Sequence, residues 1–391
     1  MNRKKAILGS AIVLYFVVCL EILIMISPFA GFFYSVFNPF LLETAKYPAT
    51  RWLSAFFLPH MVVPPDTFLK LIRIAGSVFF VGGLLIFLVC AIQVYANKFL
   101  RRGAVSKGLY SFIRHPQYAG LAVTGIGLSI LWPRFLVAVL WIVMVLVYYF
   151  LAKDEERRML REYPDTYREY MGKTGMFLPK KVETIISPAT FAGKTVLVVA
   201  ISVLTIGGAF FLRDYTVRHL PLWKGSNVVA LAILPGDLAR MEHRMGDILQ
   251  EDEIRTRLKD SASYLVYFLP PDYIMQGLVA DTGGRWKLYK HRHSIRMFFD
   301  WIVHPFGHLM GGHHMMHGTG GHSSHPMGVE RRLVFIKITD VVVRHPYDVF
   351  SIGARRIPQF MVDIDIHNLV IHDLRDLPAE TGWMDVPTPV F

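Results

Sequence analysis

Two short groups of polar residues, at the ends of neighbouring apolar runs, carry the chemistry that this sequence offers. Arg114-His115-Pro116-Gln117-Tyr118-Ala119-Gly120 opens the apolar run that ends at Trp132, and Asp154-Glu155-Glu156 closes the next one. Because the two runs are adjacent, we expect the guanidinium and imidazole to face the carboxylates. Such an arrangement suits a zwitterionic ligand that carries an ammonium, a carboxylate and a positive centre, since each charge finds a partner of opposite sign.

Composition places these groups in a membrane protein. The chain has 391 residues, of which 53% are hydrophobic and 13% aromatic, and a soluble domain of this length rarely reaches those values. The net charge of +12 comes from short basic groups beside apolar runs, such as Arg3-Lys4-Lys5 and Lys180-Lys181. This placement is typical of contact with anionic headgroups. We therefore expect membrane lipid as a partner, and no nucleic acid.

Five apolar segments are long enough, or nearly so, to cross a bilayer core of about 30 Å. Pro133-Arg134 separates the third from the fourth, so we expect these two to form a tight hairpin. The predicted fold class is a multi-pass α-helical membrane domain of about five transmembrane helices, followed by an α+β extracytoplasmic domain. The five segments are residues 6–29, 74–94, 118–132, 135–152 and 195–212.

Basic residues indicate how the chain is oriented. They precede the first segment, follow the second and the fourth, and precede the fifth, so all of these ends fall on one side of the membrane. The positive-inside tendency makes that side cytoplasmic. We expect an integral protein of a bacterial-type inner (cytoplasmic) membrane, with its N-terminus cytoplasmic. The loop over residues 32–70 and everything after Arg213 then lie outside, and the two polar groups lie inside, where soluble cofactors are found.

The chain is predicted to have four parts. Residues 1–70 hold the N-terminal transmembrane helix and an external loop, and residues 71–182 form the membrane core that carries the polar groups. Residues 183–222 hold the fifth transmembrane helix and a linker. Residues 223–391 form the extracytoplasmic α+β domain.

Periodicity in this last domain predicts both helix and strand. A long helix is expected from Pro235 to about Asp260, because apolar residues recur there at helical spacing. Alternating or continuous apolar runs predict strands over residues 228–234, 263–268, 333–343 and 360–371.

The two polar groups belong to a longer pattern that begins at Gly108-Leu109-Tyr110. After the glutamates it continues with Arg157, Leu160, Tyr163, Tyr167, Tyr170 and Phe177-Leu178-Pro179. This pattern resembles the two-part signature of the isoprenylcysteine carboxyl methyltransferases and phospholipid methyltransferases, and every spacing agrees. The resemblance covers residues 72–179, under a third of the chain. Pro164 stands where the family usually has glycine, and Met176 where a basic residue is frequent, which leaves the acceptor open.

The resemblance implies a membrane-embedded enzyme that transfers a methyl group from S-adenosylmethionine to a lipid-like or small hydrophobic acceptor. Arg114 and His115 would hold the carboxylate of this cofactor, and Glu155 or Glu156 its ammonium. Glu156 would also accept a proton from an amine or thiol acceptor. The implied catalytic residues are Arg114, His115 and Glu156. The implied cofactor-binding residues are Arg114, His115, Tyr118, Gly125, Gly127, Glu155, Glu156, Tyr167 and Tyr170.

Several of these residues have a plainer explanation. Gly125 and Gly127 are typical of close helix packing as much as of a cofactor floor. The tyrosines are equally typical of an interfacial belt. A lone arginine such as Arg114 often anchors a helix end at the headgroups, although the neighbouring His115 and the glutamates favour a site.

A histidine-rich segment lies in the predicted external domain, over residues 304–327. Imidazole and thioether side chains together suit copper, and imidazole alone suits zinc or nickel. The interleaved glycines indicate a loop, and the alternative is a solvated loop that binds metal adventitiously. The candidate metal ligands are His304, His308, His313, His314, His317, His322 and His325.

A second class of function stays open beside the enzyme. The chain would then be a non-enzymatic subunit of a larger membrane complex that retains the methyltransferase scaffold. Its external domain would dock other subunits or handle metal. The size of that domain motivates this alternative.

Overall fold

The computed structural model describes residues 43–44, 46–59, 62, 66–100, 107–188, 190–270 and 330–377. The predicted first span and the histidine-rich segment lie outside these residues. The chain divides into two compact units, the first formed by Met1–Met25 and Leu71–Leu212 and the second by Ile26–Lys70 and Arg213–Phe391. We refer to them as the helical unit and the sheet unit.

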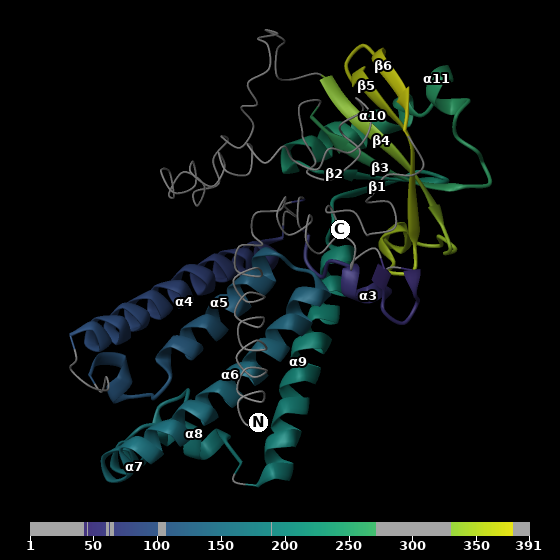
Figure 1. Ribbon diagram of the computed structural model, residues 1–391. Coiled ribbons are helices and arrows are strands. Elements are labelled where there is room, and N and C mark those ends of the chain that lie inside the picture. Colours follow the sequence, from purple (N-terminus) through teal and green to yellow (C-terminus); the bar gives the residue numbers. More distant parts are fainter. Residues whose placement is uncertain are drawn as a thin grey trace, which may run out of the picture. The chain divides into compact units, whose positions relative to one another are not determined.

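The described part of the helical unit is built from helices (Figure 1). Its long members are the ones that the apolar runs predict, and the shorter ones follow the glutamates. They are α4 (Thr67–Phe99), η1 (Gly108–Ser111), α5 (Pro116–Leu131), α6 (Phe135–Glu162), α7 (Pro164–Lys173), α8 (Lys180–Ile186) and α9 (Phe191–Arg218).

Three of the described helices are long and apolar enough to cross a membrane: α4, α6 and α9. Large apolar side chains of α9, among them Val196, Val203 and Leu204, are exposed. A helix that is apolar all round needs an apolar solvent, so this surface belongs in lipid. The chain is therefore an integral membrane protein.

The count of about five spans is not reached among the described residues. The segment predicted over residues 6–29 lies outside them. The third segment forms α5, whose 16 residues give a length of about 24 Å, short of a bilayer core of about 30 Å. In contrast, α4 is longer than the predicted segment 74–94 at both ends. At its start it includes Lys70 and Arg73, and these charges ended the apolar run from which the segment was predicted.

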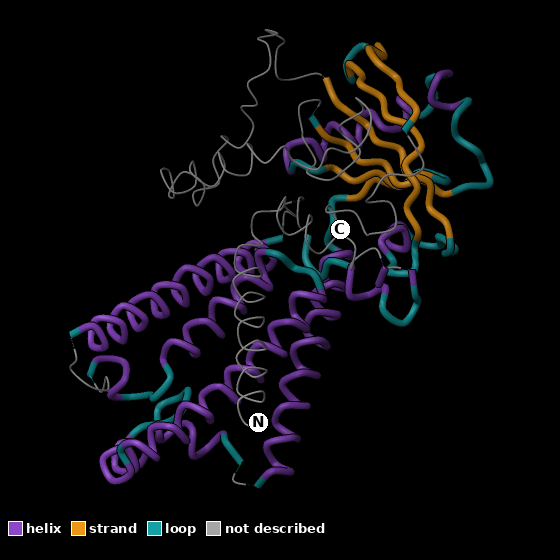
Figure 2. Tube along the Cα trace, in the orientation of Figure 1, coloured by secondary structure: helices purple, strands orange, loops and turns teal. Residues whose placement is uncertain are grey.

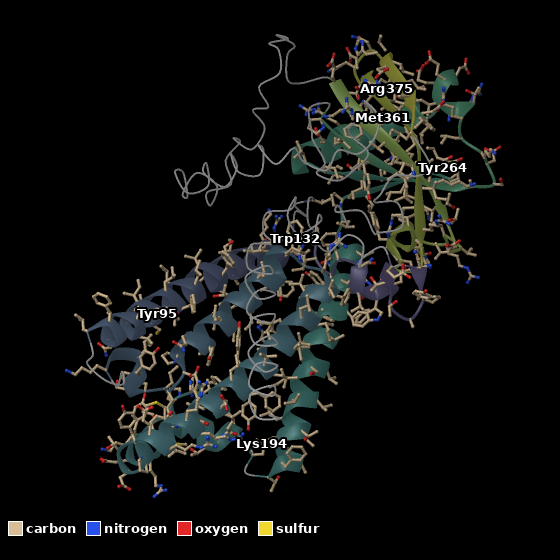
Figure 3. The ribbon with its side chains drawn as sticks, viewed as in Figure 1. Tyr95, Trp132, Lys194, Tyr264, Met361 and Arg375 are labelled. Atoms are coloured by element: carbon tan, nitrogen blue, oxygen red, sulfur yellow. The ribbon has the colours of Figure 1, made fainter. Side chains whose placement is uncertain are left out.

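The predicted hairpin between the third and fourth segments is confirmed. Trp132 ends α5, Pro133 and Arg134 turn the chain, and α6 starts at Phe135. Trp132 at this turn and Lys194 near the start of α9 lie at opposite ends of the helical unit (Figure 3). The start of α5, which carries Arg114 and His115, is thus at the end remote from Trp132.

Glycines let α4 and α5 approach each other closely. A Cβ atom on Gly83 would collide with backbone atoms of Thr124 and Gly120. A Cβ atom on Gly127 would collide with backbone atoms of Phe80 and Gly76. Small residues at helix contacts are the usual means of packing helices in membranes. They fix where the start of α5 lies along α4.

The sheet unit contains one six-stranded sheet, whose strands are orange in Figure 2. The strand order is β1-β2-β3-β4-β5-β6, with the labels of Figure 1. Its neighbours pair antiparallel except β2 and β3, which are parallel. The crossover between that parallel pair runs through α10 (Leu238–Ile248) and α11 (Asp252–Arg255). The strands are β1 (Leu222–Lys224), β2 (Val228–Ala232), β3 (Ser263–Leu269), β4 (Glu330–Thr339), β5 (Arg355–Asp365) and β6 (Val370–Asp376).

Each face of this sheet is covered by a core. Met241, Met245 and Ile248 of α10 pack on one face with Phe335. The other face takes side chains from distant parts of the sequence: Val62 of the loop before α4, Val217 and Leu220 around the end of α9, and Phe350 of η3 (Pro346–Phe350). The loop before α4, which also holds α3 (Arg51–Ser54), is thus part of the α+β fold.

Two predicted elements of this unit are wrong. The long helix from Pro235 to Asp260 ends at Ile248, because Glu251 has extended backbone angles that interrupt it before α11. The strand over residues 360–371 is a hairpin of β5 and β6. The Asp365 carboxylate accepts the backbone N–H groups of His367 and Asn368, and this side-chain turn reverses the chain.

Candidate active site

A backbone bridge joins the two halves of the sequence pattern. The N–H of Arg114 donates to the carbonyl of Gly175 at 2.8 Å, and the N–H of His115 donates to the carbonyl of Met176 at 3.0 Å. His115 has non-helical backbone angles, as expected for a residue before a proline, and Pro116 then starts α5. The segment Thr174–Met176 therefore lies along the start of α5 and holds the two basic side chains in place.

Arg114 and Glu156 form a buried ion pair. The Arg114 Nε donates to Glu156 Oε1 at 2.7 Å, and the two side chains are 6% and 3% exposed. The Arg114 Nη1 donates to the carbonyl of Thr174. Lys153, one turn earlier on α6, lies 3.4 Å from Glu156 Oε2. The Arg114 guanidinium thus binds protein groups, and its bonds join the start of α5 to α6 and to the segment after α7.

His115 and Glu155 form a second, more accessible pair. The His115 Nδ1 lies 3.3 Å from Glu155 Oε2, and the Glu155 side chain is 36% exposed. The Tyr118 hydroxyl donates to Glu155 Oε1 at 2.6 Å. Burial by itself lowers the pKa of His115, but contact with Glu155 and Glu156 outweighs it, so this pKa lies above its ordinary value of 6.5. His115 therefore binds a proton more readily than a free histidine does, and the protonated ring carries a proton on both nitrogens.

One buried polar atom of this cluster lacks a hydrogen-bond partner among the described residues. This atom is the Nε2 of His115, and Glu156 Oε1 lies 3.7 Å away from it. Buried polar groups in native proteins are nearly always bonded, so an unpaired one calls for a ligand or a water. A donor without an acceptor suits the carboxylate of a small ligand.

Aromatic rings surround the histidine. The His115 ring stacks on Tyr118 with 5.7 Å between ring centroids, and Tyr118 stacks on Tyr148 at 5.3 Å. Sequence reasoning missed Tyr148. It lies two helical turns before Glu155, on the same face of α6, and that spacing is the signal that would have found it.

Tyr167 and Tyr170 of α7 have different surroundings. Tyr167 is buried, and burial raises its pKa to about 12. Tyr170 donates its hydroxyl to the carbonyl of Tyr110, while the Tyr110 hydroxyl donates to Gln117 at 3.1 Å. Tyr170 thus connects α7 to η1, and Tyr110 and Gln117, which sequence reasoning did not single out, connect η1 to α5.

Gly125 and Gly127 face neighbouring helices. A Cβ atom on Gly125 would collide with the Trp141 ring of α6, and one on Gly127 with the backbone of α4. The space beside both residues is filled by protein. Their described contacts are those of helix packing, the plainer of the two explanations that the sequence left open.

The segment that contains this cluster is similar to a known protein family. Residues 72–166 match the family model described as phospholipid methyltransferase. The match includes Arg114, His115, Glu155 and Glu156. No curated protein and no solved structure matches the chain.

The matched segment covers roughly a quarter of the chain. It contains most of α4, all of α5 and α6, and the charged cluster. The sheet unit lies outside it. The match includes the first half of the sequence pattern and its glutamates, and it points to a methyltransferase-like membrane segment. Enzymes of this family generally use S-adenosylmethionine.

The cluster fits the polar end of that cofactor. The unpaired His115 Nε2 can donate to a carboxylate, and the partly exposed Glu155 can accept from an ammonium. The partly exposed ring of Tyr118 can attract a sulfonium cation. Arg114 is less available, since Glu156 and backbone carbonyls already occupy it.

The candidate metal ligands His304, His308, His313, His314, His317, His322 and His325 lie outside the described residues. Among the residues that the structure describes, no group of three or more His, Cys, Asp or Glu side chains is arranged to hold a metal ion. A copper or zinc site in this segment stays a prediction.

Proposed function

We propose that this chain is an integral-membrane methyltransferase that transfers a methyl group from S-adenosylmethionine to a lipid-like or small hydrophobic acceptor. One observation carries the proposal: the paired basic and acidic side chains meet at one end of an apolar hairpin, inside the segment that matches the phospholipid methyltransferases. The histidine in that cluster has a buried nitrogen with no protein acceptor among the described residues.

The geometry supports distinct roles for the four charged residues. His115 donates from Nε2 to the carboxylate of the cofactor, and Glu155 accepts from its ammonium. Arg114 and Glu156, buried against each other, are positioning residues that hold α5, α6 and Thr174–Met176 together. S-adenosylmethionine, when bound, supplies an electrophilic methyl group on sulfur.

Glu155 is better placed than Glu156 to accept a proton from the methyl acceptor. Glu156 is 3% exposed and faces two cations, Arg114 and Lys153. Glu155 is partly exposed and faces His115 and Tyr118. If the acceptor is an amine or a thiol, Glu155 is the more accessible of the two carboxylates to take its proton.

The proposed orientation puts this cluster on the cytoplasmic side and the sheet unit outside. Basic residues of the loops support it. The sheet unit gives further support, because Val62 of the loop before α4 shares a core with Val217 and Phe350. Both segments are assigned to the outside by charge, and two segments of one core must lie on one side of the membrane.

Cofactor binding by the purified full-length protein tests the proposal. Isothermal titration with S-adenosylmethionine and with S-adenosylhomocysteine should show binding, and His115→Ala and Glu155→Gln should each weaken it at least about tenfold, the effect of losing one charge-assisted bond. His345→Ala is the matched control, since Arg344-His345-Pro346 repeats the motif in the sheet unit. Undetectable binding, or binding unchanged in both variants, overturns the proposal.

A second candidate function is a non-enzymatic subunit of a membrane complex. It is favoured by the size of the sheet unit, which lies outside the family match. Stable co-purification with other subunits, together with failure to bind the cofactor, would support it. Labelled-methyl analysis of lipids from cells with and without the protein would identify the acceptor under the first candidate.

A further inference from the structure

The short helix α8 exposes an apolar face beside the candidate active site. Val182, Ile185 and Ile186 share that face at helical spacing. Ile185 is 84% exposed, and the flanking residues Leu178 and Phe191 are 41% and 87% exposed. Apolar side chains gathered on one helix face, outside any described core, mark a surface that meets a partner.

The position of α8 in the chain, just before α9, limits which partners this face can meet. Phe191 begins α9, one of the helices apolar enough to span the membrane, and α8 ends five residues earlier, at Ile186. Five extended residues reach at most about 18 Å. Helix α8 therefore stays close to the membrane surface, at the end of the unit where Figure 3 labels Lys194.

Charge restricts the partner further. Lys180 and Lys181 are exposed at the start of α8. The Lys180 Nζ lies 3.4 Å from the carbonyl of Met171, at the limit of a hydrogen bond, so its charge has no close anionic partner among the described residues. Lysines beside an exposed apolar face fit anionic headgroups, because the side chains insert between acyl chains while the ammonium groups meet phosphate.

The opposite side of α8 contacts the candidate site. The Glu183 carboxylate accepts the backbone N–H of Met176, and the carbonyl of Met176 accepts the N–H of His115. A Cβ atom on Gly175 would collide with the backbone carbonyl of Leu178 as well as with the Glu183 carboxylate, so the chain needs glycine at this position. One short helix thus has an apolar and basic face toward the surroundings and a carboxylate toward the segment that carries His115.

We propose that residues 178–188, the α8 segment, together with Phe191, form a docking surface for anionic phospholipid headgroups, and that Glu183 transmits this contact to the backbone beside His115. The lipid contact does not depend on the proposed methyltransferase activity. Binding of anionic lipid would hold α8 at the interface and so stabilise Thr174–Met176 along the start of α5.

Hydrogen–deuterium exchange of the full-length protein in nanodiscs tests the lipid contact. Amides of residues 182–186 should be more protected in discs of equal parts phosphatidylcholine and phosphatidylglycerol than in discs of phosphatidylcholine alone. The double variant Lys180→Gln/Lys181→Gln should remove this difference, which we expect to be on the order of tenfold, given the contribution of each lysine near an anionic surface. Lys224→Gln/Lys259→Gln, at exposed positions of the sheet unit, is the matched control.

A further variant tests the connection to the site. Glu183→Ala should speed exchange at the Met176 amide while the lipid dependence at residues 182–186 persists. Protection that is independent of lipid charge overturns the docking surface, and protection that rises with protein concentration assigns the face to a second copy instead. No cofactor or turnover enters these measurements, so their failure is distinguishable from failure of the proposed function.

Discussion

Breaking the buried ion pair of Arg114 and Glu156 is expected to destabilise the helical unit strongly. Both side chains are buried, and removing one partner leaves the other as an uncompensated charge. We predict that Glu156→Gln lowers the free energy of unfolding by roughly 3–5 kcal/mol. Thermal unfolding of the detergent-solubilised protein should show a clear drop in Tm.

Asp154→Asn is the matched control for this prediction. Asp154 lies two residues earlier on α6, and its pairing with Arg158 is exposed to solvent. Exposed pairs contribute little, so this variant should leave Tm unchanged. Equal Tm values for the two variants would contradict a structural role for the buried pair.

The pKa of His115 predicts a pH dependence of stability. Because contact with Glu155 and Glu156 raises this pKa above 6.5, the folded state binds the proton more tightly than the unfolded state. The stabilisation is complete below pH 6.5 and is lost as the pH rises through the folded-state pKa. The Tm difference between the wild type and His115→Gln should therefore be largest in acid and shrink at alkaline pH. A difference that stays constant across this range would show that His115 is not protonated in the fold.

At the scale of elements, the crossing of α4 and α5 depends on glycine. A Cβ atom on Gly127 would meet the backbone of Phe80 and Gly76, which cannot move aside as a side chain can. We predict that Gly127→Ala costs about 1–3 kcal/mol through overpacking, measured by thermal unfolding. Gly82→Ala on α4 meets nothing within 4 Å and should be neutral or slightly stabilising, since alanine favours helix. Destabilisation by both variants would point to glycine's flexibility instead of its size.

Elements were predictable where a single local signal dominates. Pro133 and Arg134 between two apolar runs are sufficient to place the hairpin of α5 and α6. Prediction failed where a side chain makes the turn, as Asp365 does between β5 and β6, because no glycine or proline marks that position. The meeting of the basic and acidic residues was predictable from their positions at helix ends. The support from Thr174–Met176 was not, since backbone pairing between distant segments has no side-chain pattern.

At the scale of the whole molecule, Arg213 joins three segments of the sheet unit. Its buried guanidinium donates to the carbonyl of Phe56 in the loop before α4 and to the carbonyl of Phe350 in η3. We predict that Arg213→Ala costs about 1–3 kcal/mol, the penalty for leaving buried groups unpaired. It should also speed amide exchange in residues 55–58. Arg218→Ala, at an exposed position of the same helix paired with Asp214, should leave that exchange unchanged, and equal effects would contradict the anchoring role.

The proposed orientation predicts on which side of the membrane two positions of the chain lie. Helices α4 and α9 each contain residues of both units, and the proposed orientation puts the cluster around His115 inside and the strands outside. Basic residues beside the apolar runs support this orientation. We expect alkaline phosphatase fused after Leu377 to be active in intact bacterial cells, because that enzyme folds on the outside, and the same fusion within residues 101–106 to be inactive. The reverse pattern would place the candidate active site outside, away from cytoplasmic S-adenosylmethionine, and would remove the physical basis for a methyltransferase.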